Sequence, residues 1–220
     1  MIETGIQFNN IHSYHDLGLV LSAVDIPPAK PKTNYIDIPG GDGSADLTEA
    51  NGEVKYYDRD AKFTFTMNPA GDLSDMAWEE KKTEISNLLN GIDFKITLDK
   101  DDGFYYQGRC TVDSYLSNKR VRQFVISAKL KPYKLKKSET YLKYNVTPTV
   151  QTVSITNSRK SVCPYIECSG NNTIVSFGSA TYNFSAGVHR TLDITFKHGI
   201  NKVDISGNGT VAFRFQEGEL

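Results

Sequence analysis

Apolar and polar residues alternate along several short stretches of the first half of the chain, which is the pattern of half-buried β-strands. In residues 62–67, two phenylalanines and a methionine fall on one face of an extended chain, opposite lysine and threonine. Residues 35–38 alternate as well and end at a Pro-Gly-Gly turn. Together with residues 122–130, these stretches predict several β-strands in the first half of the chain.

Residues 74–90 carry the spacing of an amphipathic helix instead. Trp78, Ile85, Leu88 and Leu89 recur at intervals that place them along one stripe of a helix. The serine that opens the segment can cap the first turn, and the glycine that follows it can take the left-handed conformation that ends a helix. We therefore expect one helix, with its apolar stripe packed against the sheet.

Residues 93–115 predict a long β-hairpin, because two apolar stretches flank the acidic turn at residues 99–103. This turn partly resembles a calcium-binding loop. The match fails because Gly103 stands where the fifth-position ligand is required, and no glutamate occupies the twelfth position. We interpret the segment as a polar hairpin turn.

Beyond Pro132 the helical spacing disappears, and about seven short strands alternate with turns rich in glycine and asparagine, as in an antiparallel β-sandwich. The expected strands cover residues 150–156, 165–169, 173–177, 181–184, 191–196, 202–205 and 210–215. The fold class is therefore mainly β with one α-helix. We place an N-terminal β-sandwich-like domain with the helix and the long hairpin at residues 1–136, and a C-terminal sandwich at residues 137–220.

Composition narrows the possible partners. The chain has 220 residues, with 25 basic and 26 acidic side chains, so it lacks the basic excess typical of nucleic-acid-binding proteins. The basic run at residues 129–137 is interpreted as a solvated connector. Residues 1–5 show neither the cationic nor the apolar region of a signal peptide, and no stretch approaches the ~20 apolar residues of a membrane span. We expect no specific nucleic-acid binding and no membrane association.

Few residues could hold a metal. His12 and His15 have a workable spacing, but no cysteine pair or acidic cluster nearby completes a site. Cys163 and Cys168 are wrongly spaced for a zinc knuckle, and with Cys110 they form an odd set that suits reduced thiols better than a disulfide framework. We expect no metal site and no cofactor.

The catalytic motifs that we tested also fail. The glycine-rich residues 39–46 lack the third glycine of a dinucleotide fingerprint and the Lys-Ser/Thr of a phosphate loop. Ser44 has no nucleophile elbow around it. Asp58 and Asp60 could serve a glycosidase only if the fold brought suitable carboxylates to the right separation. The sequence therefore does not predict an enzyme.

Several segments together resemble the distal tail protein family of long-tailed bacteriophages. Residues 8–20 are similar to the opening of that family, a hydrophobic strand and a serine followed by an Asp-x-Gly-Leu step. Residues 36–49 resemble its Pro-Gly-x-Asp-Gly-x-x-Asp-Leu-Thr signature, except that a second glycine stands at position 41 in place of the commoner arginine or glutamine. Residues 56–65 match a Tyr-x-x-Arg step before an alternating strand, and residues 213–220 resemble the aromatic strand and Glu-Gly end of many members. The helix and hairpin follow in the expected order.

This resemblance implies a structural virion protein at the phage tail tip. The N-terminal domain would form a homohexameric ring that docks on the major tail protein and, on its other face, receives the tail-associated fibre or lysin protein. The C-terminal domain would be a galectin-like or carbohydrate-module-like sandwich that holds receptor-binding or baseplate parts. The resemblance therefore places the protein in the virion tail tip, assembled in the bacterial host cytoplasm.

A carbohydrate-binding adhesion module that acts at the host cell wall is the main alternative. Exposed aromatic side chains next to polar groups suit saccharides, and the candidates are Tyr165, Tyr182 and Phe184. Core packing is the competing interpretation of each. A tube protein is a second alternative, against which the separate C-terminal sandwich argues.

Overall fold

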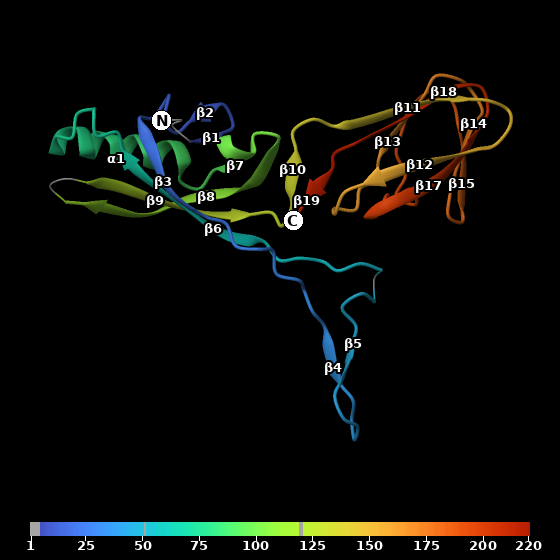
Figure 1. Ribbon diagram of the computed structural model, residues 1–220, viewed down its shortest axis with the longest axis horizontal. Coiled ribbons are helices and arrows are strands. Elements are labelled where there is room, and N and C mark those ends of the chain that lie inside the picture. Colours follow the sequence, from blue (N-terminus) through green and yellow to red (C-terminus); the bar gives the residue numbers. More distant parts are fainter. Residues whose placement is uncertain (1–4, 51, 119–120) are drawn as a thin grey trace. The chain divides into compact units, whose positions relative to one another are not determined.

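The computed structural model of the protein describes residues 5–50, 52–118 and 121–220 (Figure 1). Residues 1–4, where no signal peptide is expected, lie outside these ranges. The chain divides into two compact units, Met1–Lys134 and Leu135–Leu220, whereas the expected boundary fell between residues 136 and 137. Within the described ranges, no helix is long and apolar enough to cross a bilayer.

The N-terminal unit is built on one antiparallel sheet with the strand order β2-β1-β7-β8-β9-β6-β3. Its strands are β1 (Ile6–Phe8), β2 (Ile11–His12), β3 (Leu19–Asp25), β6 (Arg59–Met67), β7 (Asp93–Leu98), β8 (Phe104–Ser117) and β9 (Arg122–Leu130). A short 3₁₀ turn, η1 (Asp99–Asp101), joins β7 to β8. These elements confirm the predicted hairpin and the strands predicted at residues 62–67 and 122–130.

The sheet is strongly curved. Four strand spacings of about 4.8 Å separate β1 from β6 along the sheet, so a flat sheet would hold them about 19 Å apart. The rings of Phe8 and Phe65, which lie on these two strands, are nevertheless only 6.1 Å apart. Register shifts between Leu21 and Ala23 and between Val112 and Ser114 mark irregularities of the kind that bend sheets. The curved face encloses the core of the unit.

Helix α1 (Asp75–Leu89) lies across this face and confirms the predicted helix (Figure 1). The hydroxyl of Ser74 accepts the backbone N–H of Ala77 at 3.2 Å and so caps the first turn. Trp78, Ile85 and Leu89 are buried in the core. The helix therefore shields the apolar face of the sheet from water and leaves the opposite face open.

The C-terminal unit is a sandwich of two four-stranded antiparallel sheets, ordered β11-β18-β13-β16 and β12-β17-β14-β15. The eight strands of the sandwich are β11 (Thr140–Val146), β12 (Gln151–Asn157), β13 (Tyr165–Cys168), β14 (Thr173–Phe177), β15 (Ala180–Phe184), β16 (Gly187–His189), β17 (Gly199–Ser206) and β18 (Gly209–Phe215). Two further short strands, β10 (Lys134–Lys136) and β19 (Gly218–Glu219), pair with each other outside these two sheets. The inward faces of the sandwich form a second core, around Phe196, Phe213 and Phe215. The fold class is mainly β with a single helix in the described residues, as predicted.

The strand predicted at residues 191–196 is wrong. This segment consists of turns, with one isolated bridge between Val162 and Phe196. The hydroxyl of Thr195 donates to the carbonyl of Leu192 at 2.7 Å, and such local bonds compete with strand pairing. Ile194 and Phe196 are buried as expected, but Leu192 is 83% exposed. The short strand β16 before this segment, and β11 at the expected domain boundary, were not predicted.

Candidate functional site

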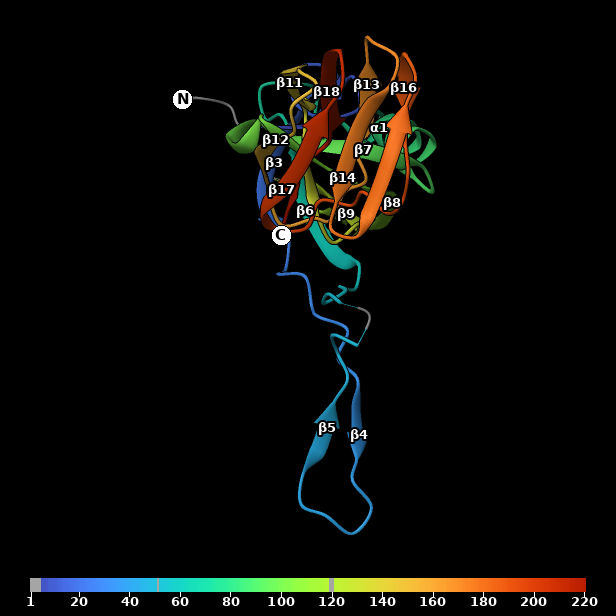
Figure 2. The ribbon, with the colours of Figure 1, turned by 90° about the vertical axis from the view of Figure 1, so that its right-hand side faces the viewer.

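A hairpin arm, residues 26–58, joins β3 to β6 in the N-terminal unit. It contains strands β4 (Tyr35–Asp37) and β5 (Ser44–Asp46). In the described part of the chain these two strands pair with each other and with no further strand. Both views show the hairpin without a neighbouring strand on either side (Figures 1 and 2).

The hairpin is ordered by local hydrogen bonds. Asp46 accepts the backbone N–H of Thr48 at 2.9 Å, and the Thr48 hydroxyl accepts the N–H of Asn34 at 3.1 Å. The side-chain and backbone hydrogen bonds from Thr48 lower the pKa of Asp46. Desolvation opposes this shift, and a further hydrogen bond from Tyr35 adds to it. The arm therefore has a defined shape although it packs against little else.

Apolar side chains of the arm face water. Every residue from 31 to 47 is exposed, including Tyr35 at 59%, Ile36 at 53% and Ile38 at 48%. An isolated two-stranded hairpin is marginally stable in water, and clustered exposed apolar groups mark contact sites. An exposed apolar arm of this kind is typical of segments that contact another molecule.

The base of the arm is held by backbone pairing. The N–H of Tyr57 donates to the carbonyl of Lys30 at 2.9 Å, and that of Lys32 donates to Lys55 at 2.7 Å. An isolated bridge joins Pro31 to Tyr56 between these bonds. The exposed hairpin therefore continues from an ordered base.

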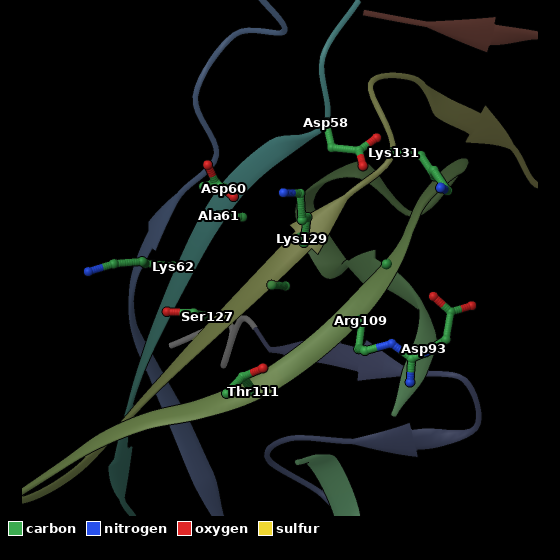
Figure 3. A pocket seen from close by; sticks show the side chains of 12 residues that line it. Asp58, Asp60, Ala61, Lys62, Asp93, Arg109, Thr111, Ser127, Lys129 and Lys131 are labelled. Atoms are coloured by element: carbon green, nitrogen blue, oxygen red, sulfur yellow. The ribbon is translucent and has the colours of Figure 1, made fainter. Parts of the chain in front are cut away.

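The sheet face opposite α1 is open and charged (Figure 3). A shallow cavity of about 550 Å³ lies over it. Asp60, Lys129, Arg109 and Asp93 stand in one cross-strand row on β6, β9, β8 and β7, so that two cations lie between two acids. Asp58 lies at the rim, and the lining contains neither histidine nor cysteine. An open face with charges of both signs suits a protein contact better than an enclosed reaction site.

The structure brings His12 and His15 together, with ring centroids 4.5 Å apart. His12 Nδ1 accepts the backbone N–H groups of Tyr14 and His15, each at 3.2 Å, so its proton belongs on Nε2, which lies 3.1 Å from Asp99 Oδ2. This bonding holds the turn beside β2 in place. Among the described residues there is no group of three or more side chains that could hold a metal ion.

The carbohydrate candidates Tyr182 and Phe184 lie together on β15. Their rings are stacked, with centroids 5.7 Å apart and an angle of 9° between the planes. Phe184 is 9% exposed and also stacks on His189, 4.7 Å away. The hydroxyl of Tyr182 donates a hydrogen bond to Asp193. Phe184 thus belongs to the edge of the core, and Tyr182 borders a shallow depression at the β14–β15 turn.

Tyr165 lies apart from these two, on the outer face of the other sheet. The guanidinium carbons of Arg190 and Arg214 are each 4.9 Å from the centroid of its ring. Arg214 forms ion pairs with Glu139 and Glu167, both at 2.9 Å, and the hydrogen bonds that it donates to these carboxylates raise its pKa. Tyr165 is therefore the centre of a charged cluster.

Several of these residues were missed in the sequence. Glu139 and Tyr141 fall just after the expected domain boundary, where no strand was predicted to orient them. Arg214 lies in a predicted strand, at a position that alternates with buried Phe213 and Phe215, so its outward direction could have been found. The arm was predicted only as a short alternating strand followed by a turn.

No protein-family model matches the sequence, and no curated protein matches it. Among solved structures, the fold matches the SPP1 Dit (gp 19.1) protein, described as a paradigm of the hub adsorption apparatus in phages that infect Gram-positive bacteria. The TM-score is 0.68 at 14% identity, over 97% of this chain and 98% of the other. The chain therefore has the fold of a phage tail hub protein over nearly its whole length, and the resemblance to distal tail proteins is confirmed at the level of the fold.

Proposed function

We propose that this protein is a structural component of a bacteriophage tail tip, a distal tail protein whose copies form a hexameric ring between the tail tube and the host-adsorption apparatus. Similarity to the SPP1 Dit fold over 97% of the chain supports the tail-tip role. The role is one of assembly, not catalysis, and it places the protein in the virion.

The arm is the observation that carries the ring proposal. Tyr35, Ile36 and Ile38 are exposed, and their burial under a partner is favourable because it removes apolar surface from water. A second copy of the chain is the simplest partner, because an arm donated to a neighbour in one direction repeats around a closed ring. The formal net charge of −1 opposes such close association little.

The ring would present two faces to other tail proteins. We propose that one face docks on the major tail protein and the other receives the tail-associated fibre or lysin protein. The open charged face with Asp60, Lys129 and Arg109 is one surface of the N-terminal unit that could meet such partners. A row of charges of both signs determines how two protein surfaces align more than how tightly they bind.

Light scattering of the purified full-length chain tests the ring. At tens of micromolar we expect a mass of about six chains, with rings visible in negative-stain electron micrographs. A monomer across this concentration range, with no ring in micrographs of intact tails, would contradict the proposal.

Recognition of host cell-wall carbohydrate by the C-terminal unit is a second candidate function. It is favoured by the cluster of Tyr165, Arg190 and Arg214 on an exposed sheet face, where aromatic and charged side chains lie together. A pull-down of the full-length chain with purified cell walls tests it, and absence of retention would leave the scaffold role alone.

A further inference from the structure

We propose that the outer face of the β11-β18-β13-β16 sheet binds a short, uncharged oligosaccharide, with Tyr141 as the stacking ring and the Glu139–Arg214–Glu167 cluster as the group that recognises its hydroxyls. This site rests on the second candidate function above and gives it a location. It also moves the aromatic contact from the residues suggested by the sequence to Tyr141.

Strand register places these groups in one row. Tyr141 on β11 is the direct partner of Arg214 on β18, which in turn is the partner of Tyr165 on β13. Alternation along the strands directs all three side chains away from the core, while their neighbours Phe213 and Ile166 are fully buried. The row therefore forms a continuous strip across three strands.

Tyr165 is poorly placed to stack on a sugar. Two guanidinium groups lie over its ring at 4.9 Å, and Arg190 also donates to its hydroxyl at 3.4 Å. Tyr141 is different, because it is 51% exposed and its ring contacts no aromatic or cationic side chain among the described residues. The electron-rich face of an open tyrosine ring suits the weakly positive C–H face of a pyranose.

Arg214 is held in place for recognition of hydroxyl groups. Its Nε donates to Glu167 and its Nη1 donates to Glu139, both at 2.9 Å, which leaves guanidinium hydrogens and carboxylate lone pairs unused. Donors and acceptors fixed in this way match adjacent hydroxyls without loss of side-chain freedom on binding.

The mixed charge of the face gives an anionic polymer little advantage over an uncharged one. The face carries Lys143, Arg190 and Arg214 beside Glu139 and Glu167, and both carboxylates lie against Arg214. A phosphodiester or uronate would meet these carboxylates together with the cations. An uncharged saccharide can bond to groups of either sign.

Size selects against a protein. Four strands spaced about 4.8 Å apart give a face about 14 Å wide. The seven residues of β11 and of β18, at about 3.4 Å each, give a height of about 24 Å, so the flat area is at most about 340 Å². A stable protein interface needs about 800 Å² on each partner. The strip is therefore large enough for a short oligosaccharide and too small to hold a protein by itself.

Calorimetric titration of the full-length chain with hexaoses of glucose, galactose and N-acetylglucosamine tests the site, with poly(glycerol phosphate) as the anionic comparison. We expect at least one neutral hexaose to bind, Tyr141→Ala and Glu167→Gln each to weaken it by about tenfold or more, and Tyr182→Ala to leave it unchanged. Light scattering of the same variants should show the wild-type oligomer.

The outcomes separate the proposals. Binding that is lost in Tyr182→Ala but kept in Tyr141→Ala would overturn this site and leave carbohydrate recognition standing. Binding of poly(glycerol phosphate) alone would overturn the uncharged ligand. No binding of any hexaose at about 10 mM would remove both the site and the second candidate function, while the ring would be judged by light scattering alone.

Discussion

The guanidinium of Arg59 donates two hydrogen bonds to the carbonyl of Pro132, from Nε at 2.9 Å and from Nη2 at 2.6 Å. Its Nη1 lies 3.5 Å from the carbonyl of Pro27 at the start of the arm, and its carbon lies 5.7 Å from the ring centroid of Tyr106. Arg59 is only 6% exposed, so these contacts are shielded from water. One side chain thus joins both ends of the arm to the segment after β9.

Replacement of Arg59 by alanine should destabilise the N-terminal unit by about 3 kcal/mol, because a buried carbonyl loses a charged, forked donor. Arg59→Lys should recover only part of this loss, since an ammonium group cannot reproduce the fork. Denaturant unfolding followed by tryptophan fluorescence measures both changes. Lys62→Ala is the control, because that lysine is exposed on the same strand and its loss should cost less than about 1 kcal/mol.

The double variant Ile36→Asp with Ile38→Asp should abolish ring formation and leave a folded monomer. Both side chains are exposed in the single chain, so the change costs little stability there, whereas charges buried in a contact are strongly unfavourable. Light scattering gives the mass and circular dichroism gives the fold. The matched control is Ile200→Asp, at a residue that is 71% exposed in the C-terminal unit. A double variant that still forms hexamers would show that the arm serves another partner.

Acid should loosen the arm. The lowered pKa of Asp46 means that its carboxylate stabilises the hairpin fully above the ordinary value of 3.8, and that this contribution disappears as the pH falls through the lowered pKa. Amide resonances of Leu47 and Thr48, followed by NMR from neutral pH to about pH 2, report the change. Asp46→Asn should remove this titration. An unchanged titration in that variant would assign the effect to another group.

The two units should unfold separately, because each has its own core. Phe213→Ala removes a fully buried ring that lies 5.7 Å from Phe196, and should destabilise the C-terminal unit by about 3–5 kcal/mol. Trp78 is the one tryptophan of the sequence and lies in the N-terminal unit. Its fluorescence transition should stay in place while the circular dichroism signal splits into two transitions. A shift of both signals together would mean that the units unfold as one.

Cys163 should be the thiol that reacts first with a disulfide reagent. All three cysteines are free, and Cys163 is partly exposed. Burial, with a smaller effect of Asp93, raises the pKa of Cys110 to about 12, and burial also raises the pKa of Cys168. Thiolate is the reactive form, so these two should react only after unfolding. Labelling at pH 8 followed by peptide mass spectrometry identifies the order, and early modification of Cys110 would contradict it.

Much of the fold could be predicted because the burial of one face of a strand or helix makes apolar residues recur at regular intervals in the sequence. Phe63, Phe65 and Met67 alternate since one face of β6 is covered, and Trp78, Ile85 and Leu89 recur with helical spacing since one stripe of α1 is covered. The same reasoning predicted a strand at residues 191–196, and that prediction was wrong. There the alternating Ile194 and Phe196 reach the core from turns, which periodicity alone does not distinguish from a strand.

The candidate sites were harder to predict, because exposed side chains show no regular spacing in the sequence. Tyr165 was selected for its residue type, but the guanidinium groups over its ring come from β18 and from the segment after β16. Tyr141 could be identified only once β11 was known to pair with β18. Side chains that act together at a surface lie on strands that pair although they are distant in sequence. A single sequence does not reveal which strands pair.

The position of the arm also determines how freely its length can change. β3 and β6 are antiparallel neighbours, with Asp25 opposite Lys62, so the arm is in thermodynamic terms the closing loop of a hairpin. The entropic cost of such a loop grows with the logarithm of its length, and a doubling costs only about 0.6 kcal/mol. Insertions or deletions in residues 33–50 should therefore leave the sheet nearly as stable as before. The reach of the arm can then evolve to fit new neighbours while the strands that anchor it stay unchanged.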